Sequence, residues 1–244
     1  MGARGENRAF PRKSSDNLEL MLLLVADTSG KYGFVALART DEADDHVEVI
    51  EEVPLTGGTF SAQLVPQIAS LLEKHGLKKT SIDAFIVVSG PGSFTGLRVG
   101  LAAIKALAEI LQKPIIPVSL LEVVALASGA RGRVAAVLDA GRGEFYVGDY
   151  EISATGARQI SEQLLGKEDM LSQAGAVFAT ADDAVEELLL ASGGKSGLVS
   201  RADASRIAAL GRRKLQAGET VSPEQLEANY IRRSDAEIFA KPAT

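Results

Sequence analysis

The sequence contains no cysteine. Disulfide bonds, thiolate chemistry and cysteine-based zinc sites are therefore excluded. Histidine is almost missing too: the chain has only His46 and His75, and they lack the spacing of metal ligands. We therefore predict no metal site. Aromatic residues make up 5% of the chain, so we expect a core built from Val, Ile, Leu and Ala.

Excess positive charge is also missing. The 244 residues carry a formal net charge of −6, whereas a protein that grips nucleic acid by itself needs a field of Lys and Arg that displaces counterions. The basic clusters at 78–79, 212–214 and 232–233 are interpreted as solvated surface. The longest apolar run near the start, residues 21–26, is far shorter than the roughly 20 residues of a membrane span. We therefore expect a cytoplasmic protein with no membrane partner.

Residues 1–20 are polar and contain Gly, Pro and Ser breakers. We expect a disordered leader or an over-long start there, with Met21 well suited to be the first residue. Beyond it, apolar runs and alternation predict strands over 22–27, 32–39, 47–53, 82–88 and 114–118. Three- and four-residue apolar spacing predicts helices over 59–75, 94–111 and 119–128, the first ended by a left-handed cap at Gly76.

The pattern then restarts, with a strand over 134–139, a turn over 140–143 and a paired strand over 144–151. Aligning Asp27 with Asp139 places Val25 on Val137 and Phe34 on Tyr146. Each half thus has an aspartate at the end of its first strand, before a hairpin turn. This predicts an α/β protein with the duplicated actin-like or Hsp70-like ATPase fold, in which two βββαβα lobes have mixed central sheets and the two aspartates face one cleft. Two unrelated hairpins are the alternative.

We assign residues 21–118 to lobe I and residues 119–221 to lobe II, with residues 222–244 packing back on lobe I. Within lobe II, helices are expected near 161–173, 182–190 and 204–216. Strands near 176–180 and 197–200 separate these helices.

The strongest local motif follows the strand over 82–88 and reads Gly90-Pro91-Gly92-Ser93-Phe94-Thr95-Gly96-Leu97-Arg98. Glycines let the backbone turn tightly or approach a partner closely, and Ser93 or Thr95 is suited to cap the helix that follows. Backbone amides at a helix start attract anions. Yet the motif has neither the Lys of a Walker loop nor the third glycine of a dinucleotide fingerprint. A purely structural strand-to-helix elbow is therefore an equal alternative to an anion site.

Catalytic candidates are few. If the fold is actin-like, a vestigial site for a nucleotide phosphate is expected at Asp27, Thr28 and Ser29, with Asp139 as its counterpart in the second lobe. Glu144 follows Asp139 closely and would repel an anion, so we do not expect hydrolysis by this chain alone. Ser93 does not lie in a Gly-x-Ser-x-Gly nucleophile elbow.

Three stretches resemble the TsaB (YeaZ) family in the same order: Val25–Ser29, Pro91–Arg98 and Leu138–Tyr146. The ending Asn229-Tyr-Ile-Arg232 is similar to that family's Tyr-Leu-Arg ending. The resemblance covers residues 21–240. It implies an actin-like fold and a non-catalytic scaffold or activating subunit that pairs with TsaD, the paralogue carrying the metal site, and with the small ATPase TsaE. The complex modifies adenosine 37 of tRNAs that read codons starting with A. ATP or ADP with magnesium would then bind only in the complex.

The resemblance also implies that the two helices from residues 59 and 94 meet TsaD, or a second copy of the chain when TsaD is absent. Where the family often has a histidine, this chain has Phe60, which puts the detail of that helix in doubt. A stand-alone actin-like ATPase or small-molecule kinase is the alternative; it would need an adenosine-binding Gly-Gly motif, and Gly193-Gly194 is better explained as a turn. A peptidase is disfavoured. The expected partner contacts are Ser61, Val65, Ile68, Leu101, Ala102 and Lys105.

Overall fold

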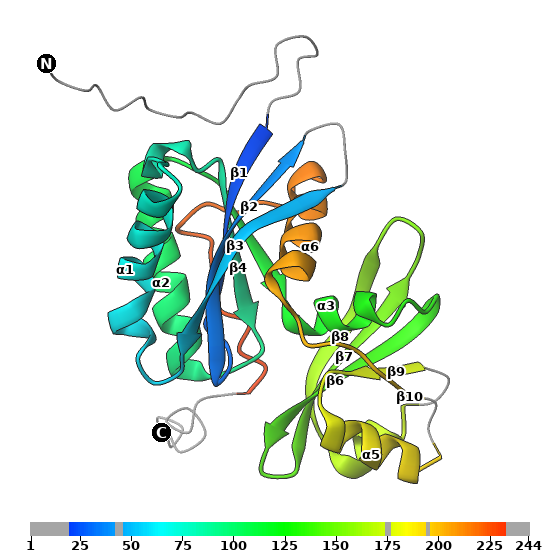
Figure 1. Ribbon diagram of the computed structural model, residues 1–244. Coiled ribbons are helices and arrows are strands. Elements are labelled where there is room, and N and C mark those ends of the chain that lie inside the picture. Colours follow the sequence, from blue (N-terminus) through cyan, green and yellow to red (C-terminus); the bar gives the residue numbers. More distant parts are fainter. Residues whose placement is uncertain (1–19, 42–45, 174–176, 194–195, 233–244) are drawn as a thin grey trace, which may run out of the picture.

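The computed structural model describes residues 20–41, 46–173, 177–193 and 196–232. These residues form two lobes, each built on a five-stranded mixed sheet (Figure 1). In lobe I the strand order is β3-β2-β1-β4-β5, with β2 antiparallel to β1 and β3, and with β4 parallel to β1 and β5. The strands are β1 (Leu20–Asp27), β2 (Tyr32–Asp41), β3 (Val47–Thr56), β4 (Ala84–Gly90) and β5 (Ile115–Ser119).

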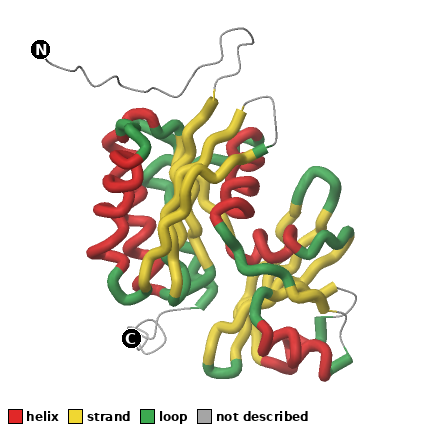
Figure 2. Tube along the Cα trace, viewed as in Figure 1, coloured by secondary structure: helices red, strands yellow, loops and turns green. Residues whose placement is uncertain are grey.

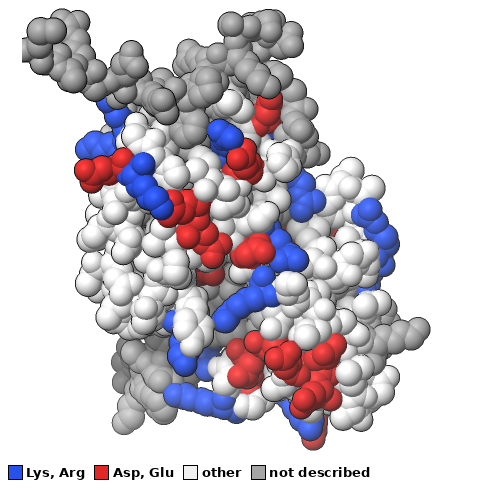
Figure 3. Space-filling model, viewed as in Figure 1, with Lys and Arg blue, Asp and Glu red and all other residues white. Residues whose placement is uncertain are grey.

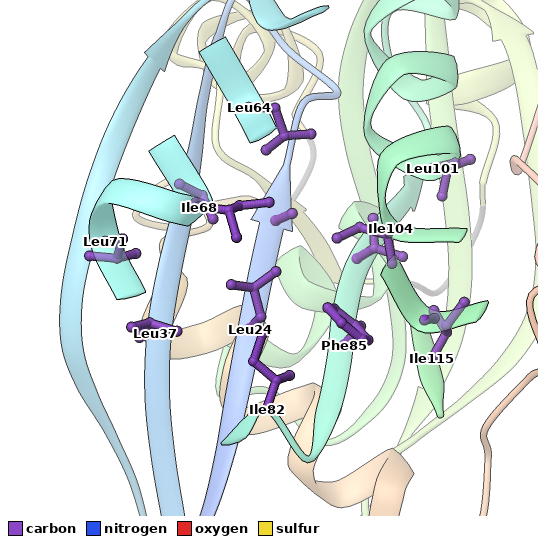
Figure 4. Close-up of a cluster of buried hydrophobic side chains, with 14 of the residues drawn as sticks. Leu24, Leu37, Leu64, Ile68, Leu71, Ile82, Phe85, Leu101, Ile104 and Ile115 are labelled. Atoms are coloured by element: carbon purple, nitrogen blue, oxygen red, sulfur yellow. The ribbon is translucent and has the colours of Figure 1, made fainter. Parts of the chain in front are cut away.

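Helices cover both faces of the lobe I sheet (Figure 2). On one face α1 (Phe60–Lys74) and α2 (Phe94–Leu111) pack over an aliphatic cluster that includes Leu24, Phe85 and Ile104 (Figure 4). On the other face lies α6 (Ala204–Gln216). Because both faces are covered, β1 and β4 are apolar along nearly their whole length, as a doubly covered parallel pair requires.

Local signals explain where these helices begin and end. Ser93 is the residue before α2, and its hydroxyl oxygen accepts a hydrogen bond from the Gly96 amide at 3.3 Å. Of the two predicted caps, Ser93 is thus the one used. Gly76 follows α1 with a φ of +64°, which confirms the left-handed cap, and its amide donates to the Glu73 carbonyl. A 3-10 turn over Lys79–Ser81 then leads into β4.

Lobe II repeats this architecture. Its sheet has the order β8-β7-β6-β9-β10, so β6 to β10 correspond one by one to β1 to β5. The duplicated fold is therefore confirmed, and the alternative of two unrelated hairpins is wrong. One face is covered by α3 (Leu120–Ala127), the other by α4 (Lys167–Leu171) and α5 (Asp183–Ala191). The strands are β6 (Gly132–Gly141), β7 (Glu144–Ile152), β8 (Ala157–Gly166), β9 (Val177–Thr180) and β10 (Ser196–Leu198).

The helix predicted over 161–173 is wrong in its first half. Residues up to Gly166 belong to β8, which pairs with β7 along its length, and only Lys167–Leu171 are helical. As an edge strand, β8 exposes much of its side-chain surface, so its sequence lacks the apolar alternation that marks a half-buried strand. Pairing with β7, which is decided by the tertiary fold, outweighs the local pattern.

The helix α6 lies in a different place from the one predicted. It was expected in lobe II, but Ala204, Ile207 and Ala208 are buried among side chains of the lobe I sheet. The chain thus crosses between lobes twice, once after β5 and once between β10 and α6 (Figure 1). Beyond α6, Val221 forms a bridge with Ile115, and Leu226 is buried in lobe I. Residues 1–19 and 233–244, part of the predicted leader and of the predicted terminal segment, lie outside the described residues.

Candidate functional site: the cleft between the lobes

The two lobes enclose a cleft of about 1130 Å³. Asp27 at the end of β1 and Asp139 near the end of β6 both line it, as the duplication predicts. Basic side chains lining the cleft are Lys31, Arg142, Arg201 and Arg232. On the face shown in Figure 3, Lys and Arg gather where the lobes meet, with a group of Asp and Glu beside them on lobe II.

Asp27 is buried at the bottom of the cleft. One of its carboxylate oxygens accepts hydrogen bonds from the Ser29 amide at 2.8 Å and from the Ser29 hydroxyl at 2.6 Å. Burial raises the pKa of this carboxyl, while the Ser29 bonds and the nearby Arg201 oppose the rise. The charged form is therefore costly here, which is typical of a group retained for a reason other than stability.

The motif after β4 packs directly onto the β1–β2 turn. The Ser93 amide donates to the Ser29 carbonyl at 2.6 Å. A Cβ on Gly92 would lie 2.4 Å from the Ser29 carbonyl oxygen, and one on Gly96 would lie 2.1 Å from that of Thr28. Both glycines are thus required by close backbone approach. The structural elbow, one of the two interpretations left open, accounts for these contacts.

The hydroxyls predicted to hold a phosphate have partners within the protein. The Thr28 hydroxyl donates to the Gly96 carbonyl at 2.8 Å, and the Ser29 hydroxyl donates to Asp27. Both residues are at most 2% exposed. A phosphate at this turn would have to displace bonds that hold α2 in place.

On the lobe II side, Asp139 is exposed and lies near the end of β6, just before the β6–β7 turn. Its carboxylate accepts from the Gly141 amide at 2.9 Å, and its own amide donates to the Asp182 carboxylate at 3.0 Å. Glu144, expected to repel an anion, pairs with Arg232 at 2.5 Å.

Several residues of the site were missed because nothing local marks them. Arg201 comes from the second crossover and Glu162 from β8, and neither lies in a motif. Glu162 accepts hydrogen bonds from Ser119, Tyr150 and Asn229, which lie on three different segments of the chain. Only the similarity of the 229–232 ending to a family ending could have drawn attention to Asn229.

The predicted partner contacts divide into two groups. Ile68 and Leu101 are 4% and 6% exposed and belong to the cluster drawn in Figure 4, so their side chains leave little surface for a partner. Their side chains face the sheet because they lie on the apolar stripes of their helices. The other four stay accessible on the outer side of α1 and α2: Ser61, Val65, Ala102 and Lys105.

Two sheets of identical strand order, related by duplication and enclosing a cleft with an aspartate from each first strand, define an actin-like ATPase fold. The family model described as TsaD, tRNA N6-adenosine threonylcarbamoyltransferase, matches residues 55–186. The chain belongs to that family, and its expected resemblance to the TsaB (YeaZ) proteins is confirmed.

Curated relatives of this chain are named TsaB. The tRNA threonylcarbamoyladenosine biosynthesis protein TsaB of Bacillus subtilis is 34% identical over 133 residues, 54% of this chain and 56% of that protein. TsaB of Escherichia coli is 30% identical over 56% of this chain and 58% of its own length. The matches thus span little more than half of these relatives. A solved Pseudomonas aeruginosa protein, described as similar to peptidase YeaZ, is 28% identical with a TM-score of 0.67, covering 87% of this chain and all of that one.

The fold implies a nucleotide with magnesium, and the family a metal. The residues present do not fit either group. The hydroxyls of the β1–β2 turn are bonded within the protein. His75 pairs with Glu51 at 2.8 Å at the end of α1, and the described residues hold no cluster of three or more His, Cys, Asp or Glu suited to a metal ion. None of the helices in the described part of the chain is long and apolar enough to cross a membrane.

Proposed function

We propose that this chain is the non-catalytic partner of a TsaD threonylcarbamoyltransferase, acting with TsaE to modify adenosine 37 of tRNA in the cytoplasm. One observation carries the proposal. The motif at Gly90–Arg98 is packed inward on the β1–β2 turn, so that it positions α2 instead of presenting donors to a substrate. The most distinctive motif of this chain fixes the position of α2. Such a subunit is suited to present that helix to a partner.

The outer face of α1 and α2 is suited to receive one. Val65 is 50% exposed and Ile110 is 70% exposed, so both apolar side chains are available to a partner. Between them α2 exposes the small residues Ala102 and Ala106. Small side chains allow another helix to approach closely, so we place the TsaD contact on this face, with Ser61 and Lys105 at its edges. Without TsaD, a two-fold homodimer through the same face would cover it.

Chemistry is assigned to the partner because this chain offers little of its own. Asp27, Thr28 and Ser29 are bonded to one another or to the motif. The Ser93 hydroxyl oxygen caps α2, and no histidine is among the described residues that line the cleft. Both observations also count against a peptidase.

Reconstitution tests the proposal. Purified chain, TsaD, TsaE, ATP, threonine, bicarbonate, the enzyme that makes threonylcarbamoyl-adenylate, and unmodified tRNA are combined, and modified adenosine is quantified by mass spectrometry. We expect product only when this chain and TsaD are both present. The variant Ala102→Glu should lose co-purification with TsaD and most of the product. Its matched control is Ala184→Glu, which places the same charge on an exposed position of α5. Modification by this chain without TsaD would overturn the non-catalytic role, and unchanged TsaD binding by Ala102→Glu would move the interface elsewhere.

A stand-alone ATPase or small-molecule kinase is the second candidate, favoured by the presence of both Asp27 and Asp139 in one cleft. Calorimetry with ATP and magnesium decides between the two. Binding that depends on Asp27, accompanied by turnover, would support the kinase reading, whereas absence of both would dismiss it.

A further inference from the structure

Residues 229–232 cross the cleft and contact both lobes, and nothing in the proposed function uses them. All four line the cleft. The segment starts from lobe I, where Val221 is bridged to Ile115 and Leu226 is buried. We call residues 229–232 the strap.

On lobe I the strap is attached to the glycine-rich motif. The Asn229 amide donates to the Ser89 carbonyl at 2.8 Å, and a Cβ on Gly90 would lie 2.6 Å from the Asn229 carbonyl oxygen. The Tyr230 ring lies 5.0 Å from that of Phe94, and its hydroxyl accepts a hydrogen bond from Arg98 Nε at 3.0 Å. The Arg98 guanidinium in turn lies 3.6 Å from the Phe94 ring centre. Phe94 and Arg98 thus form an aromatic and cationic seat for Tyr230.

On lobe II the strap has three further contacts. The Asn229 side-chain amide donates to Glu162 of β8. Ile231 packs against the apolar cluster under α3. Arg232 donates to the Gly141 carbonyl at 3.2 Å and pairs with Glu144 at 2.5 Å, so that it holds the β6–β7 turn next to Asp139.

These contacts differ in kind from the two covalent crossovers. The crossovers after β5 and before α6 join the lobes through the backbone, and next to the first of them α3 packs on lobe I, where Val123 is buried and Glu122 pairs with Lys214 at 3.0 Å. The strap ties the lobes on the cleft side, and its contacts with lobe II are made by the side chains of Asn229, Ile231 and Arg232. Its ion pair is partly solvated, with Arg232 23% and Glu144 43% exposed, so it is weak enough to be broken and re-formed.

We propose that the strap is a releasable device that holds the two lobes in their closed arrangement, with Phe94 and Arg98 as its seat on lobe I and Glu144, Gly141 and Glu162 as its attachment on lobe II. This goes beyond the proposed function, because it concerns the isolated chain and needs no partner. It also assigns a role to Phe94 and Arg98, the two members of the motif that the packing on the β1–β2 turn leaves unexplained. When the strap is released, the cleft widens and the first turn of α2 loses its cover.

The absence of cysteine makes a distance measurement simple. Spin labels are attached to cysteines introduced at Lys79, in the 3-10 turn of lobe I, and at Glu187 on α5, both exposed, and the label-to-label distance is measured by pulsed electron paramagnetic resonance. We expect one narrow distribution in the parent chain. Arg232→Glu and Glu144→Arg should each broaden it and change its mean, and the double variant should restore most of the parent distribution. The matched control reverses the pair Arg39 and Glu48, which lies within lobe I, and should change nothing.

Amide hydrogen exchange of a milder variant is a second measurement, and it tests the proposal even if the charge-reversal variants unfold. Tyr230→Phe removes only the hydroxyl that accepts from Arg98. Amide hydrogen exchange should rise about two- to tenfold in residues 229–232 and 139–144, the range expected for the net loss of one hydrogen bond, and should stay unchanged in β1 and β4. Distances unaffected by both Arg232→Glu and Glu144→Arg, or exchange that rises equally throughout the chain in Tyr230→Phe, would overturn the proposal.

Discussion

Gly100 on α2 faces Thr28 across a tight contact between the helix and the β1–β2 turn. A Cβ on Gly100 would lie 2.2 Å from the Thr28 hydroxyl oxygen, well inside van der Waals contact. Thr28 is 2% exposed and its hydroxyl is bonded to the Gly96 carbonyl. The variant Gly100→Ala must therefore either move α2 away from the turn or rotate Thr28 and break that bond.

The expected cost follows from opposing terms. Overpacking a well-packed site costs about 1–3 kcal/mol, and replacing glycine by alanine within a helix returns about 1 kcal/mol. We expect Gly100→Ala to lower the free energy of unfolding by up to about 2 kcal/mol. Thr28→Ala loses one hydrogen bond, about 1 kcal/mol. In the double variant the atom nearest to the new Cβ of residue 100 is the Cβ of residue 28, at 3.4 Å. The steric clash is therefore removed, while the higher helix propensity of alanine still stabilises the protein.

Urea unfolding followed by far-ultraviolet circular dichroism measures all four proteins, since the chain has no tryptophan to report by fluorescence. Gly100→Ala should destabilise the parent but be neutral or stabilising in the Thr28→Ala background, a coupling of about 2 kcal/mol. The slopes of free energy against urea should agree, which shows that the same surface unfolds in each. If Gly100→Ala has equal cost in both backgrounds, to within about 0.5 kcal/mol, the motif is not held by this contact.

Three further outcomes are expected. Because burial raises the pKa of Asp27, its ionisation disfavours the folded state, so Asp27→Asn should be more stable than the parent at pH 7, with the difference vanishing in acid unfolding below about pH 4. Burial and the neighbouring Glu162 raise the pKa of Tyr150; the parent should lose stability above about pH 10, the ordinary tyrosine value, and Tyr150→Phe should lose less in alkaline denaturation. Arg133→Ala removes the guanidinium that pairs with buried Asp149 at 2.6 Å, and thermal unfolding should show a lower Tm because the buried carboxylate loses its partner.

Interlobe contacts explain which parts of the site could be predicted. The positions of Asp27 and Asp139 follow from the strand pattern, because each ends an apolar run that must be buried. The Arg98–Tyr230 bond joins residues 132 positions apart, and no local pattern requires it. The same holds for Glu162, whose three donors come from other segments.

The predicted partner contacts were ambiguous for a related reason. The spacing of the apolar residues predicts which side of α1 and α2 is apolar. That side could pack either against the sheet of the same lobe or against a helix of a partner. Ile68 and Leu101 turn out to face the sheet, and the residues left for a partner lie on the opposite side, where Val65 and Ala102 are exposed.

The sequence by itself determined the elements with strong periodicity, the helix caps at Ser93 and Gly76, and the duplication that gives the cleft its two aspartates, since these depend on interactions within a few residues of each other. The tertiary structure decided the rest. It made a strand of residues 157–166 because β7 offered a partner, and it placed α6 on lobe I, whose uncovered sheet face accepts the helix's apolar stripe. It also brought residues 229–232 across the cleft. Each of these outcomes depends on which distant surface is available for burial or pairing, and a local sequence pattern does not specify that surface.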